Sequence, residues 1–177
     1  MTVTPEQLKR ILSPVRYDDE KLKDITEALN KTLEWYSINT PLRVTHFLAQ
    51  VLHESGGFRY QEEIASGAAY EGRQDLGNTQ PGDGKRYKGR GWIQLTGRAN
   101  YTSAGKDFKQ PFVDNPVLAG QFPWAALLSG WFWNKRKLND LADKDDIEAV
   151  TRKVNGLKMN GLEDRKMWLK KAKEVLS

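Results

Sequence analysis

Glu54 is the side chain whose position best suits acid–base chemistry. It closes an apolar helical stripe that starts at Val44, and it precedes the break at Gly56-Gly57. At about 100° per residue, Glu54 falls about 280° around the helix from Val44, at the edge of the stripe. Partial desolvation there would favour a protonated carboxylic acid, which is what cleavage of a glycosidic bond needs. Periodicity alone leaves an ordinary solvent-facing glutamate as the alternative.

A second acid for sugar hydrolysis is available just after the glycine break. Glycosidases use two carboxyl groups that flank the scissile bond. Glu62 and Glu63 follow Gly56-Gly57, and a turn there would let one of them face Glu54. The alternative is that both are surface charges.

The sequence gives no support for a metal or another cofactor. The motif His-Glu-x-x-His would need a histidine at position 57, where this chain has Gly57. The other histidine, His46, lies seven positions before His53, which is too far for an easily shared metal. Cysteine is absent, which excludes disulfides and thiolate sites. Both histidines are expected to pack or to form hydrogen bonds.

The segment 89–97 is the other dense group of polar and glycine residues. It lacks the third glycine and the Lys-Ser/Thr ending of phosphate-binding loops. Alternating residues in 92–96 predict a short strand, within a small hairpin over Tyr87–Leu95, that shows Gln94 and Thr96 on one side. An amide and a hydroxyl on one wall suit a sugar or a held water. The following residues Arg98, Asn100 and Tyr101 are equally consistent with a polar surface.

Helices must position these groups, because apolar residues recur at helical spacing through most of the chain. Thr4, Pro5 and Gln7 predict a capped helix that Pro14 stops, and Thr40 and Pro41 predict the start of the helix carrying Glu54. Further helices are expected over 18–36, 124–133, 147–154 and 162–176. The stretch 66–91 reads as a long ordered loop, which is usually functional in a compact domain. These features predict a mainly α protein.

Size and charge narrow the function classes further. The 177 residues are expected to form one catalytic domain over 1–177, without a separate cell-wall-binding domain. The formal net charge of +5 fits either a merely soluble basic protein or one attracted to a polyanion. No nucleic-acid-binding motif, signal peptide or membrane-spanning apolar run is evident, so neither nucleic acid nor stable membrane insertion is expected.

Three segments share a specific pattern: His53-Glu54-Ser55-Gly56-Gly57, then Asp75-Leu76-Gly77-Asn78-Thr79-Gln80-Pro81-Gly82-Asp83-Gly84, then Tyr87-Lys88-Gly89-Arg90-Gly91-Trp92-Ile93-Gln94-Leu95-Thr96-Gly97-Arg98-Ala99-Asn100-Tyr101. Together they resemble glycoside hydrolase family 19, most closely its bacteriophage and prophage endolysin branch. The likeness extends over residues 40–170 and includes Trp131-Phe132-Trp133, Val154-Asn155-Gly156 and Asp164-Arg165. Two features depart from it. Leu157 stands where family members often have a second glycine. Glu62 is adjacent to Glu63, so the resemblance leaves open which of the two is the catalytic base.

The resemblance implies a lysozyme-like, two-lobed helical fold with the loop and hairpin beside an active-site cleft. It implies an inverting mechanism with Glu54 as general acid, Glu63 as the base that activates water, and Thr96 holding that water. Positions that bind sugar or tune the acids are matched by Gln94, Asn100, Asn155 and Arg165. Within the same matched segment, the residues Arg90, Trp92 and Tyr101 are also expected to bind substrate.

Three functions remain open. The first hypothesis is an endolysin that cleaves the β-1,4 bond between N-acetylmuramic acid and N-acetylglucosamine in bacterial peptidoglycan. The second is a chitinase that uses the same residues, and the third is a non-enzymatic wall-binding module. An anionic wall would suit the basic residues Lys85, Arg86, Lys88, Arg90 and Arg98. By analogy with single-module endolysins, we expect a monomer made in the host bacterial cytoplasm that reaches the periplasm and cell wall through a holin pore.

Overall fold

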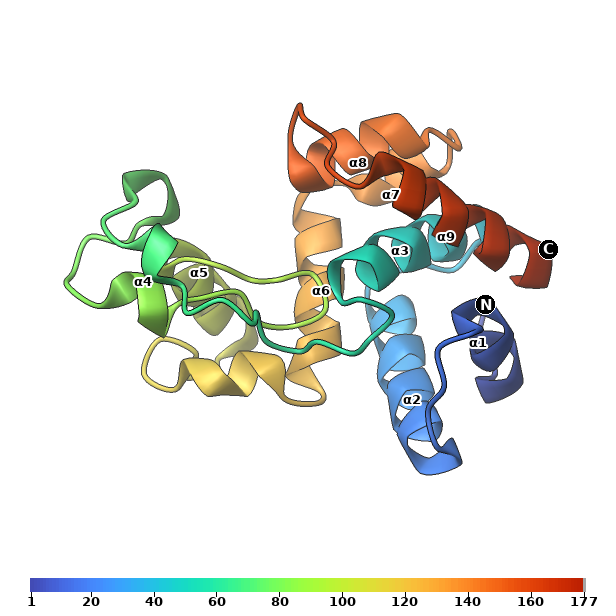
Figure 1. Cartoon of the computed structure of the whole chain (residues 1–177), viewed down its shortest axis with the longest axis horizontal. Helices are drawn as coiled ribbons and strands as arrows, with labels where there is room; N and C mark the ends of the chain where they lie inside the picture. The colour runs from blue at the N-terminus through green and yellow to red at the C-terminus, as the bar shows by residue number, and fades with distance from the viewer. Residues whose placement is uncertain (177) are drawn as a thin grey trace.

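The computed structural model describes residues 1–176 and consists mainly of helices (Figure 1). The α-helices are α1 (Pro5–Leu12), α2 (Asp19–Trp35), α3 (Pro41–Glu54), α4 (Asp83–Arg86), α5 (Arg98–Phe108), α6 (Trp124–Lys135), α7 (Leu138–Ala142), α8 (Ile147–Asn155) and α9 (Leu162–Leu176). Three 3-10 helices are η1 (Ala68–Tyr70), η2 (Gln74–Leu76) and η3 (Pro116–Gly120). No helix in this part of the chain combines the length and apolar character needed to cross a membrane.

The predicted helix starts are confirmed. The Thr4 hydroxyl accepts a hydrogen bond from the Gln7 amide, and the Gln7 side chain accepts one from the Thr4 amide. Thr40 caps α3 in the same way through the amide of Arg43. Helix α1 ends at Leu12, two residues before Pro14.

Helix α3 lies in the centre of the larger helical group. Its apolar positions, Val44 to Leu52, are fully buried. It packs along α9, which contributes Trp168, Leu169 and Ala172 to the same core, and Figure 1 shows the two helices side by side. Burial on this scale stabilises the helix far more than its intrinsic propensity does.

Helix α6 connects two packed clusters. Trp133 and Ala126 belong to the larger core with α3, whereas Leu128 and Trp131 face the smaller cluster. A side chain at Gly130 would approach a Tyr36 ring carbon to 2.2 Å, so this glycine lets α6 lie directly against α2. Figure 1 shows α6 between the group that contains α4 and α5 and the remaining helices. The predicted two-lobed helical fold is therefore confirmed.

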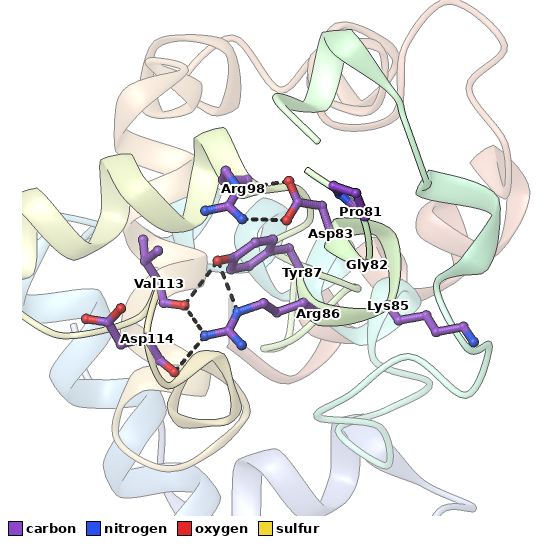
Figure 2. Close-up of a pocket in the computed structure, with 9 residues that line it drawn as sticks. All are labelled: Pro81, Gly82, Asp83, Lys85, Arg86, Tyr87, Arg98, Val113 and Asp114. Atoms are coloured by element: carbon purple, nitrogen blue, oxygen red, sulfur yellow. Dashed lines mark hydrogen bonds and ion pairs between the residues drawn. The ribbon is translucent and has the colours of Figure 1, made fainter. Parts of the chain in front are cut away.

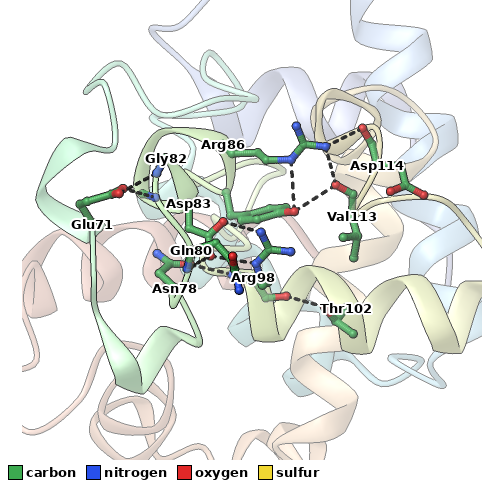
Figure 3. Close-up of polar contacts among 12 residues, drawn as sticks. Glu71, Asn78, Gln80, Gly82, Asp83, Arg86, Arg98, Thr102, Val113 and Asp114 are labelled. Atoms are coloured by element: carbon green, nitrogen blue, oxygen red, sulfur yellow. Dashed lines mark hydrogen bonds and ion pairs between the residues drawn. The ribbon is translucent and has the colours of Figure 1, made fainter.

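The long loop is ordered by hydrogen bonds within the smaller lobe (Figure 3). The Glu71 carboxylate accepts hydrogen bonds from the amides of Gly82, at 2.6 Å, and Gly84, at 2.8 Å. Asp83, only 1% exposed, receives two hydrogen bonds from the Arg98 guanidinium, at 2.8 and 2.6 Å. Asn78 also accepts from the Arg98 amide. The loop thereby joins α4 to the start of α5.

The predicted hairpin is wrong. Within residues 1–176, regular strands are replaced by two isolated bridges, Glu62 with Arg90 and Arg90 with Leu95. Arg90 and Leu95 exchange two backbone hydrogen bonds across a tight turn that starts at Gly91, where φ is +82°. Gln94 also has a positive φ of +61°, which is incompatible with a strand. The residues after this turn, from Arg98 onwards, form helix α5.

Candidate active site

Glu54 occupies the last position of α3, with its side chain 19% exposed. This agrees with the half-buried position predicted at the rim of the apolar stripe. Its Oε1 atom accepts a hydrogen bond of 2.5 Å from Nη2 of Arg165. The carboxylate is therefore partly buried and held by a cation.

Arg165 is fully buried, so it is poorly placed for direct contact with a sugar and well placed to tune the acid. Nη1 donates to Oε1 of Gln50 at 2.6 Å, and Nε donates to the carbonyl of Asn160 at 3.3 Å. Gln50 in turn donates to the hydroxyl of Thr151 at 3.3 Å. Helices α3, α8 and α9 thus hold one guanidinium. A buried charge is stable only when paired and hydrogen-bonded in this way.

Asn155 supports the same arrangement from the end of α8. Its Oδ1 atom accepts from the Asn160 amide at 2.8 Å and closes the loop before α9. The carbonyl of Asn160 then accepts from Arg165. Asn155 is therefore linked to Glu54 through Asn160 and Arg165. This link is compatible with a role in tuning the acid, which was expected for Asn155 as an alternative to sugar binding.

The two histidines form hydrogen bonds, as expected. His53 lies 2.6 Å from Asp164 through Nδ1, and its ring fills the space beside Gly161, where a Cβ would come within 2.1 Å of the ring. His46 lies 2.7 Å from Asp145 through Nε2. Burial lowers the pKa of His46, although Asp145 opposes that shift. The histidine next to Glu54 thus ties the end of α3 to the start of α9.

Glu63 and Glu62 have different electrostatic surroundings. The Glu63 carboxylate accepts from the Tyr70 hydroxyl at 2.9 Å and from the Gly89 amide at 3.1 Å, both neutral donors. Glu62 instead lies 2.6 Å from the Lys88 ammonium and 3.2 Å from the Arg90 guanidinium. Desolvation raises the pKa of Glu62, but these two cations bring it below its usual value. Burial and the hydrogen bond to Glu63 raise the pKa of Tyr70.

Gln94 and Glu63 lie beside the same glycine. A Cβ at Gly89 would stand 2.3 Å from Oε1 of Gln94 and 3.3 Å from Oε2 of Glu63. The Thr96 hydroxyl is half-buried and donates to the Gln94 carbonyl at 2.9 Å, which leaves its oxygen able to accept. Asn100 donates to the Thr96 carbonyl at 2.8 Å. Because position 89 has no side chain, the Gln94 amide and the Glu63 carboxylate can both lie close to its backbone.

Three residues expected to bind substrate are buried in the structure. Trp92 is 0% exposed and packs on Phe58, with ring centroids 4.5 Å apart. Tyr101 is also fully buried; its hydroxyl donates to the Lys88 carbonyl and accepts from Arg90. Arg90 is buried as well and pairs with Glu62. These side chains hold the turn in place, and their contact with substrate stays a prediction.

Sequence reasoning missed Gln50 and Tyr70, which contact the two acids or their partners. A signal existed for Gln50, because a polar residue four positions before Glu54 lies on the same helical face, one turn away. Tyr70 lies in η1, and its approach to Glu63 depends on the loop conformation, for which the sequence offered no periodicity.

Residues 43–150 match the family model described as chitinase class I. The chain belongs to glycoside hydrolase family 19. Glu54, Glu63, Gln94 and Thr96 all lie within the matched range, whereas Arg165 lies after it.

Similar proteins within family 19 come from plants and bacteria. An endochitinase of Arabidopsis thaliana is 40% identical over 119 residues, which are 67% of this chain and 41% of the plant protein. The chain thus spans less than half the length of that relative. A family 19 domain-containing protein of Haemophilus influenzae is 29% identical over 175 residues, covering 81% of this chain and 85% of the relative.

Solved family 19 structures share the fold. Chitinase C of Streptomyces griseus superposes with a TM-score of 0.77 at 25% identity, covering 98% of this chain and 76% of the chitinase. The class IV chitinase of Zea mays gives a TM-score of 0.77 at 24% identity and covers 98% of this chain and 92% of its own. This likeness confirms the lysozyme-like helical fold.

Proposed function

We propose that the chain hydrolyses β-1,4 glycosidic bonds of an N-acetylglucosamine polymer, with chitin as the first substrate to test. The observation that carries this proposal is the pair of differently held carboxyl groups within the family 19 segments. Glu54 is held by the buried Arg165, and Glu63 is held by neutral donors. The relatives named endochitinases favour chitin over the peptidoglycan suggested first by the sequence pattern.

In this mechanism, Glu54 donates a proton to the glycosidic oxygen as the bond to the anomeric carbon breaks. Glu63 removes a proton from the water that attacks the opposite face of the sugar, which inverts the anomeric configuration. The accepting oxygen of Thr96 is a candidate to orient this water. Gln94 and Asn100 are candidates to contact the sugar, since both side chains are only half-buried.

Peptidoglycan is the second candidate, favoured by the positive charge of +5. Digestion of purified peptidoglycan and of chitin oligomers in parallel, with product masses measured, tests the two substrates. Release of N-acetylglucosamine oligomers supports the first candidate, and muropeptides with inert chitin support the second. If neither polymer releases new reducing ends, the proposed hydrolysis is wrong. Passage through a holin pore remains a prediction for the peptidoglycan case.

Replacing Glu54 with Gln tests the acid directly. An amide cannot supply the proton, so kcat should fall by about 10²–10⁴-fold, the usual contribution of general acid–base catalysis. Gln keeps an oxygen that can accept from Arg165 but removes the charge that pairs with this buried cation, so the melting temperature should fall as well, and kcat is measured at a temperature where the variant is folded. A matched control is Glu148→Gln on the exposed surface of α8, which should keep full activity. Unchanged kcat in the Glu54 variant would reject the assignment.

A further inference from the structure

The smaller lobe contains a pocket outside the carboxylate pair, here called the α4–α5 pocket (Figure 2). Its volume is about 630 Å³, within the range of sites that hold small ligands. Residues from α4, from the start of α5 and from Val113-Asp114 line it. It is therefore large enough for a sugar residue with a substituent rather than for a single ion.

Neither Lys85 nor Arg86 in this pocket has an ion-pair partner within residues 1–176, but hydrogen bonds hold Arg86 in place. Its Nη2 atom donates to the carbonyls of Val113, at 3.0 Å, and Asp114, at 2.9 Å, while Nε donates to the Tyr87 hydroxyl at 3.2 Å. These acceptors are neutral. Across residues 1–176, no carboxylate lies within 4.0 Å of its guanidinium, in contrast to Lys88, Arg90 and Arg98.

The guanidinium is also preorganised for a ligand. Three hydrogen bonds fix its plane, and Nη1 donates to no acceptor in the described part of the chain. The Arg86 and Arg98 guanidinium carbons lie 5.7 and 4.8 Å from the Tyr87 ring centroid, so two cations flank one ring (Figure 2). Arg98 donates to Asp83 through Nε and Nη2, and its Nη1 has no acceptor among residues 1–176. Each guanidinium therefore has one nitrogen, Nη1, with which it can donate to an anion such as a carboxylate.

The floor of the pocket is rigid as well. Glu71 holds the amides of Gly82 and Gly84, and the buried Asp83 holds Arg98 (Figure 3). A site that is already ordered loses less conformational entropy on binding.

We propose that the α4–α5 pocket is a subsite for a carboxylate-bearing glycan, in which Arg86 receives the carboxylate. Chitin has no such group, whereas N-acetylmuramic acid carries one on its lactyl ether. The inference rests on the proposed function in one respect, because the ligand is taken to be a glycan of the N-acetylglucosamine type. It assigns no catalytic role to the pocket.

The test is a titration of the full-length ¹⁵N-labelled chain, with backbone amide shifts as the readout. The probes are N-acetylmuramic acid, N-acetylglucosamine and lactate. The first carries both the sugar and the carboxylate, the second only the sugar, and the third only the carboxylate. N-acetylmuramic acid should shift the amides of Gly82, Arg86 and Asp114, and N-acetylglucosamine at the same concentration should leave them in place. Lactate should bind more weakly than N-acetylmuramic acid.

The variant Arg86→Gln should weaken N-acetylmuramic acid binding by about tenfold, since a hydrogen-bonded charge is removed. Arg10→Gln is the matched control; it makes the same charge change on the exposed surface of α1 and should bind like the parent. Equal shifts from both sugars, lactate binding as tight as that of N-acetylmuramic acid, or an unaffected Arg86→Gln variant would each overturn the proposal. The comparison of probes on the parent chain decides even if Arg86→Gln fails to fold.

Failure of the proposed hydrolysis gives a different result. Monosaccharide binding requires no bond cleavage, so the Glu54→Gln chain should show the same shifts in the α4–α5 pocket. A chain that binds N-acetylmuramic acid there but cleaves neither polymer would retain the subsite and lose the proposed activity.

Discussion

At the residue scale, the adjacent carboxylates of Glu62 and Glu63 differ in the groups that donate hydrogen bonds to them. Glu62 is the partner of two cations, so its charge serves to hold Lys88 and Arg90. Glu63 accepts from a phenol and a backbone amide, which position it without cancelling its charge. Because its two cations hold the pKa of Glu62 below its usual value, Glu62 is a poor proton acceptor for an attacking water.

This difference predicts opposite outcomes for two isosteric variants. Glu63→Gln should lower kcat by about 10²–10⁴-fold with little loss of stability, because removal of the base slows water attack. Glu62→Gln should keep kcat within about twofold and instead lower the melting temperature, because it leaves Arg90 buried with a weaker partner. Initial rates on one oligomer and thermal melts measure both. The reverse pattern would move the base to position 62.

The sequence predicted the position of Glu54 correctly because helical periodicity alone places it at the edge of a buried face. It could not predict Arg165 as the partner of that acid, since the contact joins residues 111 positions apart. The sequence also did not reveal that Trp92 and Tyr101 are fully buried. The sequence of a short, glycine-rich turn does not show which side of the turn packs against the rest of the protein. Here the turn lies against α6, where the Ala125 carbonyl accepts a hydrogen bond from the Trp92 amide.

At the element scale, the helices with side-chain caps or long apolar stripes were predictable. The prediction failed for 87–101, where the alternation in 92–96 suggested a strand and α5 was missed. Helix α5 starts at Arg98, its N-cap residue Gly97 has no side chain to cap it, and it buries only Tyr101 and Ala104. Local signals were therefore weak, and tertiary contacts determine the conformation.

The Asp83–Arg98 pair gives an element-scale prediction, because it joins α4 to α5. Asp83→Asn should destabilise the chain by about 2 kcal/mol at pH 7, as expected for a lost charged hydrogen bond. The hydrogen bond from Arg98 brings the pKa of Asp83 below its usual value of 3.8. The stabilisation is therefore complete above that value and is lost as pH falls through the lower, folded-state pKa.

Thermal melts of the parent and of Asp83→Asn between pH 7 and pH 2.5 check this sign. The gap between their melting temperatures should be widest near neutral pH and should narrow below about pH 4. Asp114→Asn, at an exposed position of the same pocket, serves as the control and should follow the parent. A gap that widens on acidification would contradict the argument.

At the scale of the whole molecule, net positive charge should separate the two candidate polymers. Screening lengths shrink from about 30 Å at 0.01 M salt to about 10 Å at 0.1 M, so attraction to an acidic polymer weakens over this range. For soluble peptidoglycan fragments, KM should rise about threefold or more between these salt concentrations. For uncharged chitin oligomers it should stay nearly constant, and an equal rise for both would show that charge plays no part in selection.

The distance in sequence between Glu54 and Arg165 determines when their contact can form during translation. The two residues are 111 positions apart, so the acid leaves the ribosome long before its cation does. Until then Gln50 and Glu54 lack the guanidinium that joins them, and α3 lacks the surface of α9 against which it packs. A nascent chain should therefore acquire the complete Glu54–Arg165 contact only after α9 has been made and has docked on α3.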